Sequence, residues 1–318
     1  MRILILGKLQ PSDEIVEEIK AVASDVEVRR EENWKEAESA LKKAEVIVTT
    51  KGEFPREAVN DAPNLKWVHS LMVGVESFLY PEFTDRDIML TNPRGAADVA
   101  VSEHAFALML SWTRGIPRSL KLQKERKWDK VQVNHMKGKT MGIIGLGSIG
   151  QEIARKAKEA FRMSVMATKR KMTQVDYVDK LLSPEEIDDL LCESDYIVVA
   201  AAMTKETDKL IGEREFKIMK PDAFFVNIAR GQIVDEKALI KALENKWIAG
   251  AGLDVFEMEP LAKESPLWQM ENVIITPHIA GVSDKKLADL RVKVFIENLK
   301  SYKAGRGLLT EVDKELGY

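Results

Sequence analysis

Three residues that can bind anions or exchange protons each come just after an apolar run in the second half of the chain. Arg230 follows FVNIA, Glu259 lies shortly after LDV, and His278 follows IITP. Because the carboxyl ends of parallel strands meet at one edge of a sheet, we expect these side chains to converge there. Each residue type also has an ordinary structural role: a solvated arginine, a glutamate in an acidic loop, and a packed or surface histidine.

Together the three residue types suit the reduction of a ketone by a nicotinamide cofactor. Hydride transfer leaves negative charge on the carbonyl oxygen, so a general acid must deliver a proton. Histidine, with an unperturbed pKa of ~6.5, suits that task, and a carboxylate on its other nitrogen would fix the tautomer. An arginine can pair with a substrate carboxylate and polarise the adjacent carbonyl. His69, His104 and His135 are assigned to structure, because no acid partner or glycine turn frames them.

A glycine-rich run indicates where a dinucleotide would bind. Residues 145–150 read GLGSIG, after an apolar stretch at 140–144 that predicts a buried strand and before a helical pattern at 151–159. Strand, glycine turn and helix together predict a site where backbone N–H groups meet a pyrophosphate. A packed turn without a ligand would show the same pattern. The predicted cofactor contacts here are Gly145, Gly147, Ser148, Ile149 and Gly150.

The residues after the next predicted strand bear on the choice of cofactor. NAD enzymes place an acidic residue there to bind the ribose hydroxyls. Here the strand at 164–167 is followed by Thr168, Lys169 and Arg170. A carboxylate would repel a 2′-phosphate, whereas these cations attract one, so the sequence predicts a preference for NADP over NAD. The alternative is that both cations are solvated surface residues.

Short apolar runs alternate with amphipathic segments along the whole chain. Further strands are predicted at 3–6, 26–28, 46–48, 67–69, 88–90, 164–167, 196–200, 223–228, 249–255 and 273–276. Further helices are predicted at 12–22, 34–43, 101–112 and 284–302. This β-α-β-α order predicts parallel sheets with helices on both faces, in two α/β units. The helix at 101–112 is apolar on more than one face, which fits burial in the fold or at a subunit contact.

The composition is that of an ordinary soluble globular protein, with 45% hydrophobic and 31% charged residues. A length of 318 residues favours two domains. The net charge of −3 gives no bulk reason to bind nucleic acid or an anionic membrane, and the longest apolar run, 196–203, is too short for a membrane helix. The single cysteine, Cys192, fits a reducing compartment and is expected to be a small packed side chain. We expect a cytoplasmic protein without a metal site.

Four motifs together resemble one enzyme family. They are GKTMGIIGLGSIG at 138–150, FVNIARGQIVDEKAL at 225–239, AGLDVFEMEP at 251–260 and TPHIAG at 276–281. In these motifs the chain resembles the D-isomer-specific 2-hydroxyacid dehydrogenases, which include glyoxylate/hydroxypyruvate reductases and D-lactate and phosphoglycerate dehydrogenases. The resemblance covers most of the chain and is strongest between residues 138 and 281.

The resemblance implies a fold of two doubly wound parallel-sheet α/β domains. A Rossmann cofactor domain, residues 98–283, would be inserted into a flavodoxin-like substrate domain, residues 1–97 and 284–318. It implies that Arg230 binds the substrate carboxylate and carbonyl, that Glu259 orients the histidine, and that His278 donates the proton. It also suggests a homodimer through the region of the helix at 101–112.

The resemblance also implies further binding residues. Asp254 would lie near the nicotinamide carboxamide and Thr207 beside the cofactor. In the segment LMVGVE at 71–76, the N–H groups of Val73 and Gly74 would hold the substrate carboxylate. The chain departs from the family pattern in three places: Glu76 replaces a frequent aspartate, the loop at 201–204 lacks a proline, and no acidic residue ends the strand at 164–167.

The leading hypothesis is an NADP(H)-linked reductase of small 2-keto acids, such as glyoxylate or hydroxypyruvate, acting reversibly as a D-2-hydroxyacid dehydrogenase. One alternative is 3-phosphoglycerate dehydrogenase, which the end of the chain soon after the last predicted helix makes less favoured. Arg94 could meet such an anionic substrate or be a surface loop charge. A dinucleotide-sensing co-regulator is another alternative, and the intact Arg230, Glu259 and His278 argue against it.

Overall fold

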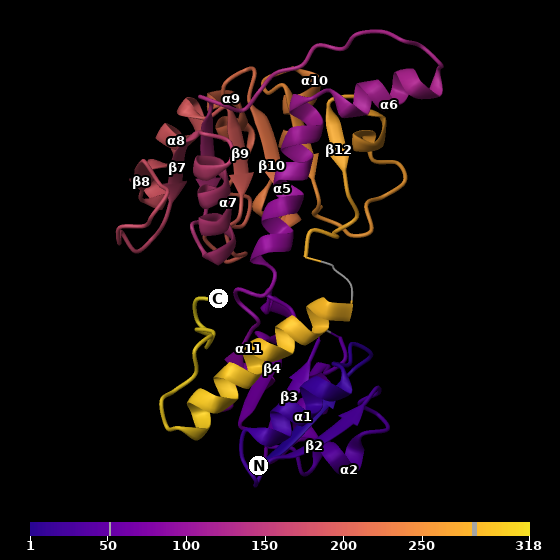
Figure 1. Cartoon of the computed structure of the whole chain (residues 1–318), viewed down its shortest axis with the longest axis vertical. Coiled ribbons are helices and arrows are strands. Elements are labelled where there is room, and N and C mark those ends of the chain that lie inside the picture. Colours follow the sequence, from indigo (N-terminus) through magenta and orange to yellow (C-terminus); the bar gives the residue numbers. More distant parts are fainter. Residues whose placement is uncertain (51, 282–284) are drawn as a thin grey trace. The chain divides into compact units, whose positions relative to one another are not determined.

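Two parallel sheets, each in its own compact unit, organise the chain (Figure 1). The computed structural model describes residues 1–50, 52–281 and 285–318. Unit 1 comprises Met1–Ala97 and Ser283–Tyr318, and unit 2 comprises Asp98–Val282. The predicted second crossing between domains, at residues 283–284, lies outside the described residues.

The sheet of unit 1 has five parallel strands in the order β2-β1-β3-β4-β5, which is the flavodoxin-like order. The strands are β1 (Arg2–Leu6), β2 (Glu27–Glu31), β3 (Val46–Thr49), β4 (Trp67–Ser70) and β5 (Met89–Thr91). Strands β3 and β4 are buried along their whole length, as expected when helices cover both faces of a parallel sheet. All five were predicted, with boundaries within three residues.

Helices cover the two faces of this sheet with separate apolar clusters. On one face, α1 (Asp13–Ala21) packs with α11 (Lys285–Lys303) over Ile3, Ile5 and Trp67. The other face carries α2 (Glu38–Leu41), α3 (Arg56–Asn60), α4 (Pro81–Thr84) and the short 3-10 helix η1 (Glu76–Phe78). The helix predicted over 34–43 is longer than the observed α2. Before α2, the Asn33 side chain accepts a hydrogen bond from the Lys35 N–H and begins a turn instead of a helix.

The sheet of unit 2 has seven parallel strands in the order β12-β11-β10-β9-β6-β7-β8. The strands are β6 (Thr140–Ile144), β7 (Ser164–Thr168), β8 (Lys180–Leu182), β9 (Tyr196–Val199), β10 (Phe224–Asn227), β11 (Gly250–Leu253) and β12 (Val273–Ile275). The chain runs outward from β6 in one direction through β7 and β8, and in the other through β9 to β12. This is the Rossmann order with one added strand, and its switch point lies between β6 and β9, where such sheets bind ligands.

In unit 2, α5 (Asp98–Thr113) and α7 (Ser148–Glu159) cover one face of the sheet, as Figure 1 shows. The other face carries α8 (Ile187–Glu193), α9 (Glu213–Ile218) and α10 (Glu236–Glu244). The remaining 3-10 helices are η2 (Pro184–Glu186), η3 (Gly231–Ile233) and η4 (Pro266–Gln269). A Cβ at Gly252 would lie 3.0 Å from the Leu108 Cβ, and Trp112 stacks on Phe224 at 5.0 Å, so the broad apolar surface of α5 packs on its own sheet.

Three features of unit 2 differ from the sequence prediction. Helix α6 (Ile116–Lys124), with Gly115 as its N-cap and Pro117 in its first turn, and strand β8 were not predicted. Cys192 is exposed and lies at the solvent side of α8, so the expectation of a packed thiol was wrong. Within the described residues, no helix is long and apolar enough to cross a membrane.

Candidate active site

The glycine turn after β6 has three glycines with three separate structural roles. Gly145 has φ +94°, and a Cβ there would lie 2.5 Å from the Cα of Ala201, in the loop after β9. A Cβ at Gly150 would lie 2.4 Å from the Gly145 carbonyl oxygen, so only glycine lets α7 pack this closely. At Gly147, by contrast, a Cβ would meet no described atom within 4 Å. The backbone at Gly147 is therefore open to a ligand.

The start of α7 supplies hydrogen-bond donors at this open position. Gly147 is the N-cap, and no side chain caps the helix. The first-turn N–H groups of a helix attract phosphate groups, so the turn fits the pyrophosphate of a dinucleotide. The hydroxyl of Ser148 donates to the Asp98 carboxylate at 3.1 Å, and Ile149 is half-buried at the same helix start.

The three residues predicted to select the cofactor have different environments. Thr168 is buried, and its hydroxyl accepts the Gly145 N–H at 3.1 Å, so it shapes the glycine turn rather than facing solvent. Lys169 is half-buried, with its ammonium 3.4 Å from the Thr173 hydroxyl, and Arg170 is exposed. The structure therefore assigns the Thr168 hydroxyl to the glycine turn, whereas Lys169 and Arg170 lie at its half-buried and exposed positions after β7.

Thr207 closes the loop that follows β9. Its hydroxyl donates to the Ala202 carbonyl at 2.7 Å and accepts the Thr204 N–H at 2.8 Å. These bonds hold residues 202–207 in a closed turn although the loop lacks a proline. Because Ala201 touches the glycine turn, the loop with Thr207 is fixed beside the predicted cofactor position.

Arg230 lies at the start of η3, directly after β10, in a loop that Asn227 shapes. The Asn227 amide donates to the Arg230 carbonyl at 2.9 Å, and its oxygen accepts the Ala229 N–H at 3.1 Å. Asn227 is buried, and sequence reasoning missed this role; the only signal was an amide at the end of an apolar strand. A Cβ at Gly231 would lie 1.9 Å from the Phe256 carbonyl carbon. The loop carrying Arg230 therefore packs directly on the loop that leads to Glu259.

Glu259 and His278 form a close hydrogen-bonded pair. The His278 Nδ1 lies 2.6 Å from the Glu259 Oε2, while Oε1 accepts the Phe256 N–H at 3.1 Å. An ionised carboxylate can only accept, so Nδ1 must donate and Nε2 remains as the reactive nitrogen. The His278 side chain is 45% exposed and that of Glu259 36%, so neither side chain is enclosed by the protein. A histidine and carboxylate in this arrangement can deliver or remove a proton.

Asp254 lies beneath the turn that carries His278 and is fully buried. Its carboxylate accepts the N–H groups of Ile279 and Ala280, each at 2.9 Å, and the Thr276 hydroxyl at 2.6 Å. Burial by itself would raise the pKa of Asp254, but hydrogen bonds from His104, Thr276 and the two N–H groups hold this pKa below its ordinary value. His104, whose Nε2 lies 3.3 Å from Asp254, therefore has an acid partner, and the contrary expectation was wrong.

In unit 1, the segment after β4 presents two backbone donors. The Ser70 hydroxyl accepts the Met72 N–H, and the Asn92 amide donates to the Val73 carbonyl at 2.8 Å, which fixes the loop. Among the described residues, the N–H groups of Val73 and Gly74 meet no hydrogen-bond acceptor. These donors suit a carboxylate. Arg94 is exposed in the turn after β5.

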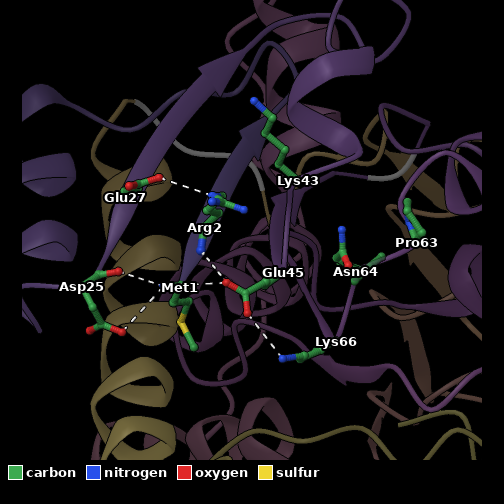
Figure 2. A pocket seen from close by; sticks show the side chains of 10 residues that line it. Met1, Arg2, Asp25, Glu27, Lys43, Glu45, Pro63, Asn64 and Lys66 are labelled. Carbon is green, nitrogen blue, oxygen red and sulfur yellow. Dashed lines mark hydrogen bonds and ion pairs between the residues drawn. The ribbon is translucent and has the colours of Figure 1, made fainter.

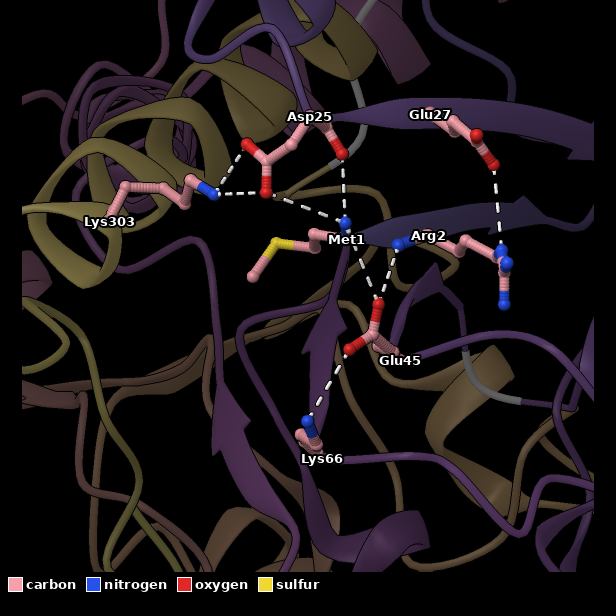
Figure 3. A network of polar contacts seen from close by, with 7 residues as sticks. All are labelled: Met1, Arg2, Asp25, Glu27, Glu45, Lys66 and Lys303. Carbon is pink, nitrogen blue, oxygen red and sulfur yellow. Dashed lines mark hydrogen bonds and ion pairs between the residues drawn. The ribbon is translucent and has the colours of Figure 1, made fainter.

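A polar hollow of about 530 Å³ lies at the opposite, amino-terminal edge of the unit 1 sheet (Figure 2). The charged groups that Figure 3 draws are paired with one another. Glu45 lies 3.4 Å from the Lys66 ammonium, the Asp25 carboxylate accepts a hydrogen bond from Lys303 at 2.7 Å, and the Asp25 carbonyl accepts one from the Met1 amine at 2.8 Å. Ligands of parallel α/β sheets bind at the carboxyl ends of the strands, so this hollow is not the candidate site.

The comparison with known proteins decides the family. Residues 106–280 match the family described as D-isomer specific 2-hydroxyacid dehydrogenase, NAD binding domain. The chain belongs to the D-isomer-specific 2-hydroxyacid dehydrogenases. It is therefore an enzyme of this dehydrogenase class with an NAD-binding domain, and the predictions of the family and of the two-domain fold are confirmed.

Three relatives of this dehydrogenase bear on its substrate and cofactor. The glyoxylate reductase of Pyrococcus furiosus is 39% identical over 92% of this chain and 90% of its own. The D-3-phosphoglycerate dehydrogenase of Archaeoglobus fulgidus is 36% identical over 88% of this chain but only 53% of its own. The structure of an NADPH-dependent glyoxylate/hydroxypyruvate reductase from Sinorhizobium meliloti, in complex with citrate, superposes with a TM-score of 0.81 at 27% identity, covering 99% of this chain and 98% of the other.

Proposed function

We propose that this 2-hydroxyacid dehydrogenase reduces small 2-keto acids such as glyoxylate or hydroxypyruvate with NADPH, and in reverse oxidises D-2-hydroxy acids. The observation that carries the proposal is the 2.6 Å pair between His278 and Glu259, because it leaves Nε2 as the imidazole nitrogen for proton transfer. The likeness to the Pyrococcus furiosus glyoxylate reductase supports a short keto acid as the substrate.

In the proposed reaction the bound nicotinamide supplies the hydride to the carbonyl carbon. His278 holds the proton at Nε2 and delivers it to the carbonyl oxygen as negative charge develops there. Glu259 keeps Nδ1 protonated and stabilises the imidazolium before the transfer. In the reverse direction the neutral Nε2 accepts the hydroxyl proton. His278 is thus the acid in reduction and the base in oxidation.

The substrate carboxylate needs a separate anchor, and we assign it to Arg230 and the N–H groups of Val73 and Gly74. Guanidinium binding would also polarise the neighbouring carbonyl, which promotes attack at carbon. The cofactor would bind to residues 98–283, with its pyrophosphate at Gly145–Gly150, while 1–97 and 284–318 would form the substrate domain. Thr207 and Asp254 would line the cofactor side of the site.

We assign the 2′-phosphate of NADPH to Lys169 and Arg170. Lys169 and Arg170 follow β7 directly, where NAD enzymes place the acidic residue that would repel the phosphate. A hydrogen bond to a charged group contributes about 1.5–3 kcal/mol, which corresponds to a roughly 10- to 100-fold preference for NADPH over NADH. The NADPH dependence of the Sinorhizobium meliloti neighbour supports this choice.

We further propose a homodimer in the cytoplasm. The apolar surface of α5 is used within unit 2, but Ile116 and Leu120 of α6 are about half exposed and Trp128 beyond it is fully exposed. Large exposed apolar side chains on adjoining segments are typical of a subunit contact. The single cysteine fits a reducing compartment.

A phosphorylated 2-keto or 2-hydroxy acid is the second candidate substrate, because the Archaeoglobus fulgidus relative is a D-3-phosphoglycerate dehydrogenase. Arg94 would then meet the phosphate. A co-regulator without turnover is disfavoured, since the His278–Glu259 pair is assembled.

The test is a substrate panel with both cofactors. We expect NADPH oxidation with glyoxylate or hydroxypyruvate at a kcat/KM at least tenfold above that with NADH, and weak turnover of 3-phosphohydroxypyruvate. Replacing Lys169 and Arg170 together with alanine should abolish the NADPH preference, whereas the control Lys171→Ala, at a neighbouring exposed lysine, should retain it. A clear NADH preference of the unmodified enzyme would overturn the cofactor assignment, and absence of turnover with every keto acid would overturn the function.

A further inference from the structure

A second histidine, distant in sequence from the proposed proton donor, connects to it through the half-buried Thr276 and the buried Asp254. His104 lies on α5, and its Nε2 is 2.9 Å from the Thr276 hydroxyl and 3.3 Å from the Asp254 carboxylate. The His104 side chain is only 17% exposed and that of Asp254 1%. This cluster joins α5 to the ends of β11 and β12, directly under the turn that presents His278.

The direction of each hydrogen bond follows from the number of protons available. The Thr276 hydroxyl has one proton, and it lies 2.6 Å from the Asp254 Oδ1, which in its ionised form only accepts. The hydroxyl therefore donates to Asp254 and must accept from the Nε2–H of His104. His104 thus carries its proton on Nε2, pointing at both the threonine oxygen and the carboxylate.

The same carboxylate holds the turn at His278 in an unfavourable conformation. His278 has φ +54°, in the left-handed region that residues other than glycine rarely adopt. The Asp254 carbonyl accepts the His278 N–H at 2.8 Å, and its two carboxylate oxygens accept the N–H groups of Ile279 and Ala280. Asp254 is therefore the common partner of His104 on one side and of the His278 turn on the other.

We propose that His104 is a positioning residue for His278, acting through Thr276 and Asp254. By donating from Nε2 it fixes the rotamers of the threonine hydroxyl and of the buried carboxylate, which in turn hold the turn that directs the His278 ring at Glu259. Its kinetic consequence depends on the function proposed above. If His104 only packed α5 on the sheet, its loss would lower the stability of unit 2 without moving the His278 ring.

The kinetic test compares His104→Ala with His104→Gln, whose side-chain amide can donate from near the Nε2 position. We expect His104→Ala to lower kcat for keto-acid reduction about 10- to 100-fold, because a misplacement of a reacting group by about 1 Å can cost roughly 100-fold in rate. The KM for the keto acid should change less than twofold, because Arg230 lies on a separate loop. His104→Gln should restore most of kcat. His135→Ala is the matched control, since His135 is exposed.

A spectroscopic test does not depend on turnover. The chain has four histidines, so a long-range 1H–15N spectrum of the whole protein, with His278→Asn used for assignment, reports the tautomer of each ring. We expect His278 to be protonated on Nδ1 in the unmodified protein and in His104→Gln, and to become a mixture of tautomers in His104→Ala. An unchanged His278 tautomer in His104→Ala overturns the proposal, whatever happens to turnover. If no keto acid reacts with the unmodified protein, the proposed function fails, and this spectrum still decides the role of His104.

Discussion

Acidification should destabilise unit 1 through the buried His69 on β4. Burial lowers the pKa of His69 from 6.5 to about 3. The ring has no charged partner at Nδ1, which lies 2.7 Å from the Thr91 hydroxyl, and that hydroxyl also accepts the Trp67 indole N–H at 2.8 Å. The folded state therefore binds fewer protons than the unfolded state between these pKa values. Stability is fully present above pH 6.5 and is lost as the pH falls towards 3.

The magnitude follows from the two pKa values. At pH 5 the expected loss is about 2 kcal/mol, and the limit near pH 3 is about 5 kcal/mol, because each pH unit corresponds to about 1.4 kcal/mol. The range from pH 7 to 5 is the informative one, since carboxylates with ordinary pKa values remain ionised there. Histidines that stay exposed contribute no such slope.

Native-state hydrogen exchange with mass spectrometry measures this slope in unit 1 separately from unit 2. The exchange rates of peptides covering β4 and β5 are corrected for the intrinsic rate at each pH. The opening free energy calculated from them should be about 2 kcal/mol lower at pH 5 than at pH 7. His69→Asn keeps a hydrogen-bonding partner for Thr91 but cannot titrate, so it should be less stable at pH 7 and have a flat profile. The control His135→Asn should follow the unmodified protein. Equal slopes for the unmodified protein and His69→Asn would refute the reasoning.

Two substitutions test the geometry of the proposed site. Glu259→Gln should lower kcat/KM for keto-acid reduction about 10²- to 10⁴-fold, because the amide no longer stabilises the imidazolium. Unimpaired turnover of this variant in a steady-state assay would show that the 2.6 Å pair between His278 and Glu259 is not functional. Gly231→Ala places a methyl group 1.9 Å from the Phe256 carbonyl carbon, so the loops of Arg230 and Glu259 must separate. We expect reduced thermal stability and at least a tenfold lower kcat/KM, and a variant with unchanged activity would contradict the tight packing of the two loops.

The strands of the sheets were predictable because parallel strands buried on both faces read as continuous apolar runs. Strand β8 escaped prediction because Lys180–Leu182 is short and lies at the edge of its sheet. Helix α6 was not predicted because Gly115 and Pro117 are typical of a helix end, whereas here Pro117 lies in the first turn, where proline is well tolerated. The expectation of a packed Cys192 was wrong because the apolar periodicity of α8 does not determine whether a residue at the end of the helix faces the core or the solvent.

The His278–Glu259 pair agrees with the sequence analysis because both residues follow adjacent strands of a parallel sheet, β12 and β11. The cluster around Asp254 was out of reach of this reasoning. His104 comes from a helix that precedes the glycine turn, and it meets Thr276 across 172 residues of sequence. Only the packing of α5 on the sheet brings them together, and no local pattern encodes that contact.

All the side chains proposed to exchange protons or contact the cofactor come from one contiguous stretch of chain. The glycine turn, Arg230, Glu259 and His278 all lie between Asp98 and Val282, in unit 2. The proposed substrate donors, Val73 and Gly74, lie instead in unit 1. On the proposed function, substitutions at Val73 and Gly74 would alter substrate binding without changing the His278–Glu259 pair. Substrate specificity could then diverge among related enzymes while the residues proposed for proton transfer stay the same.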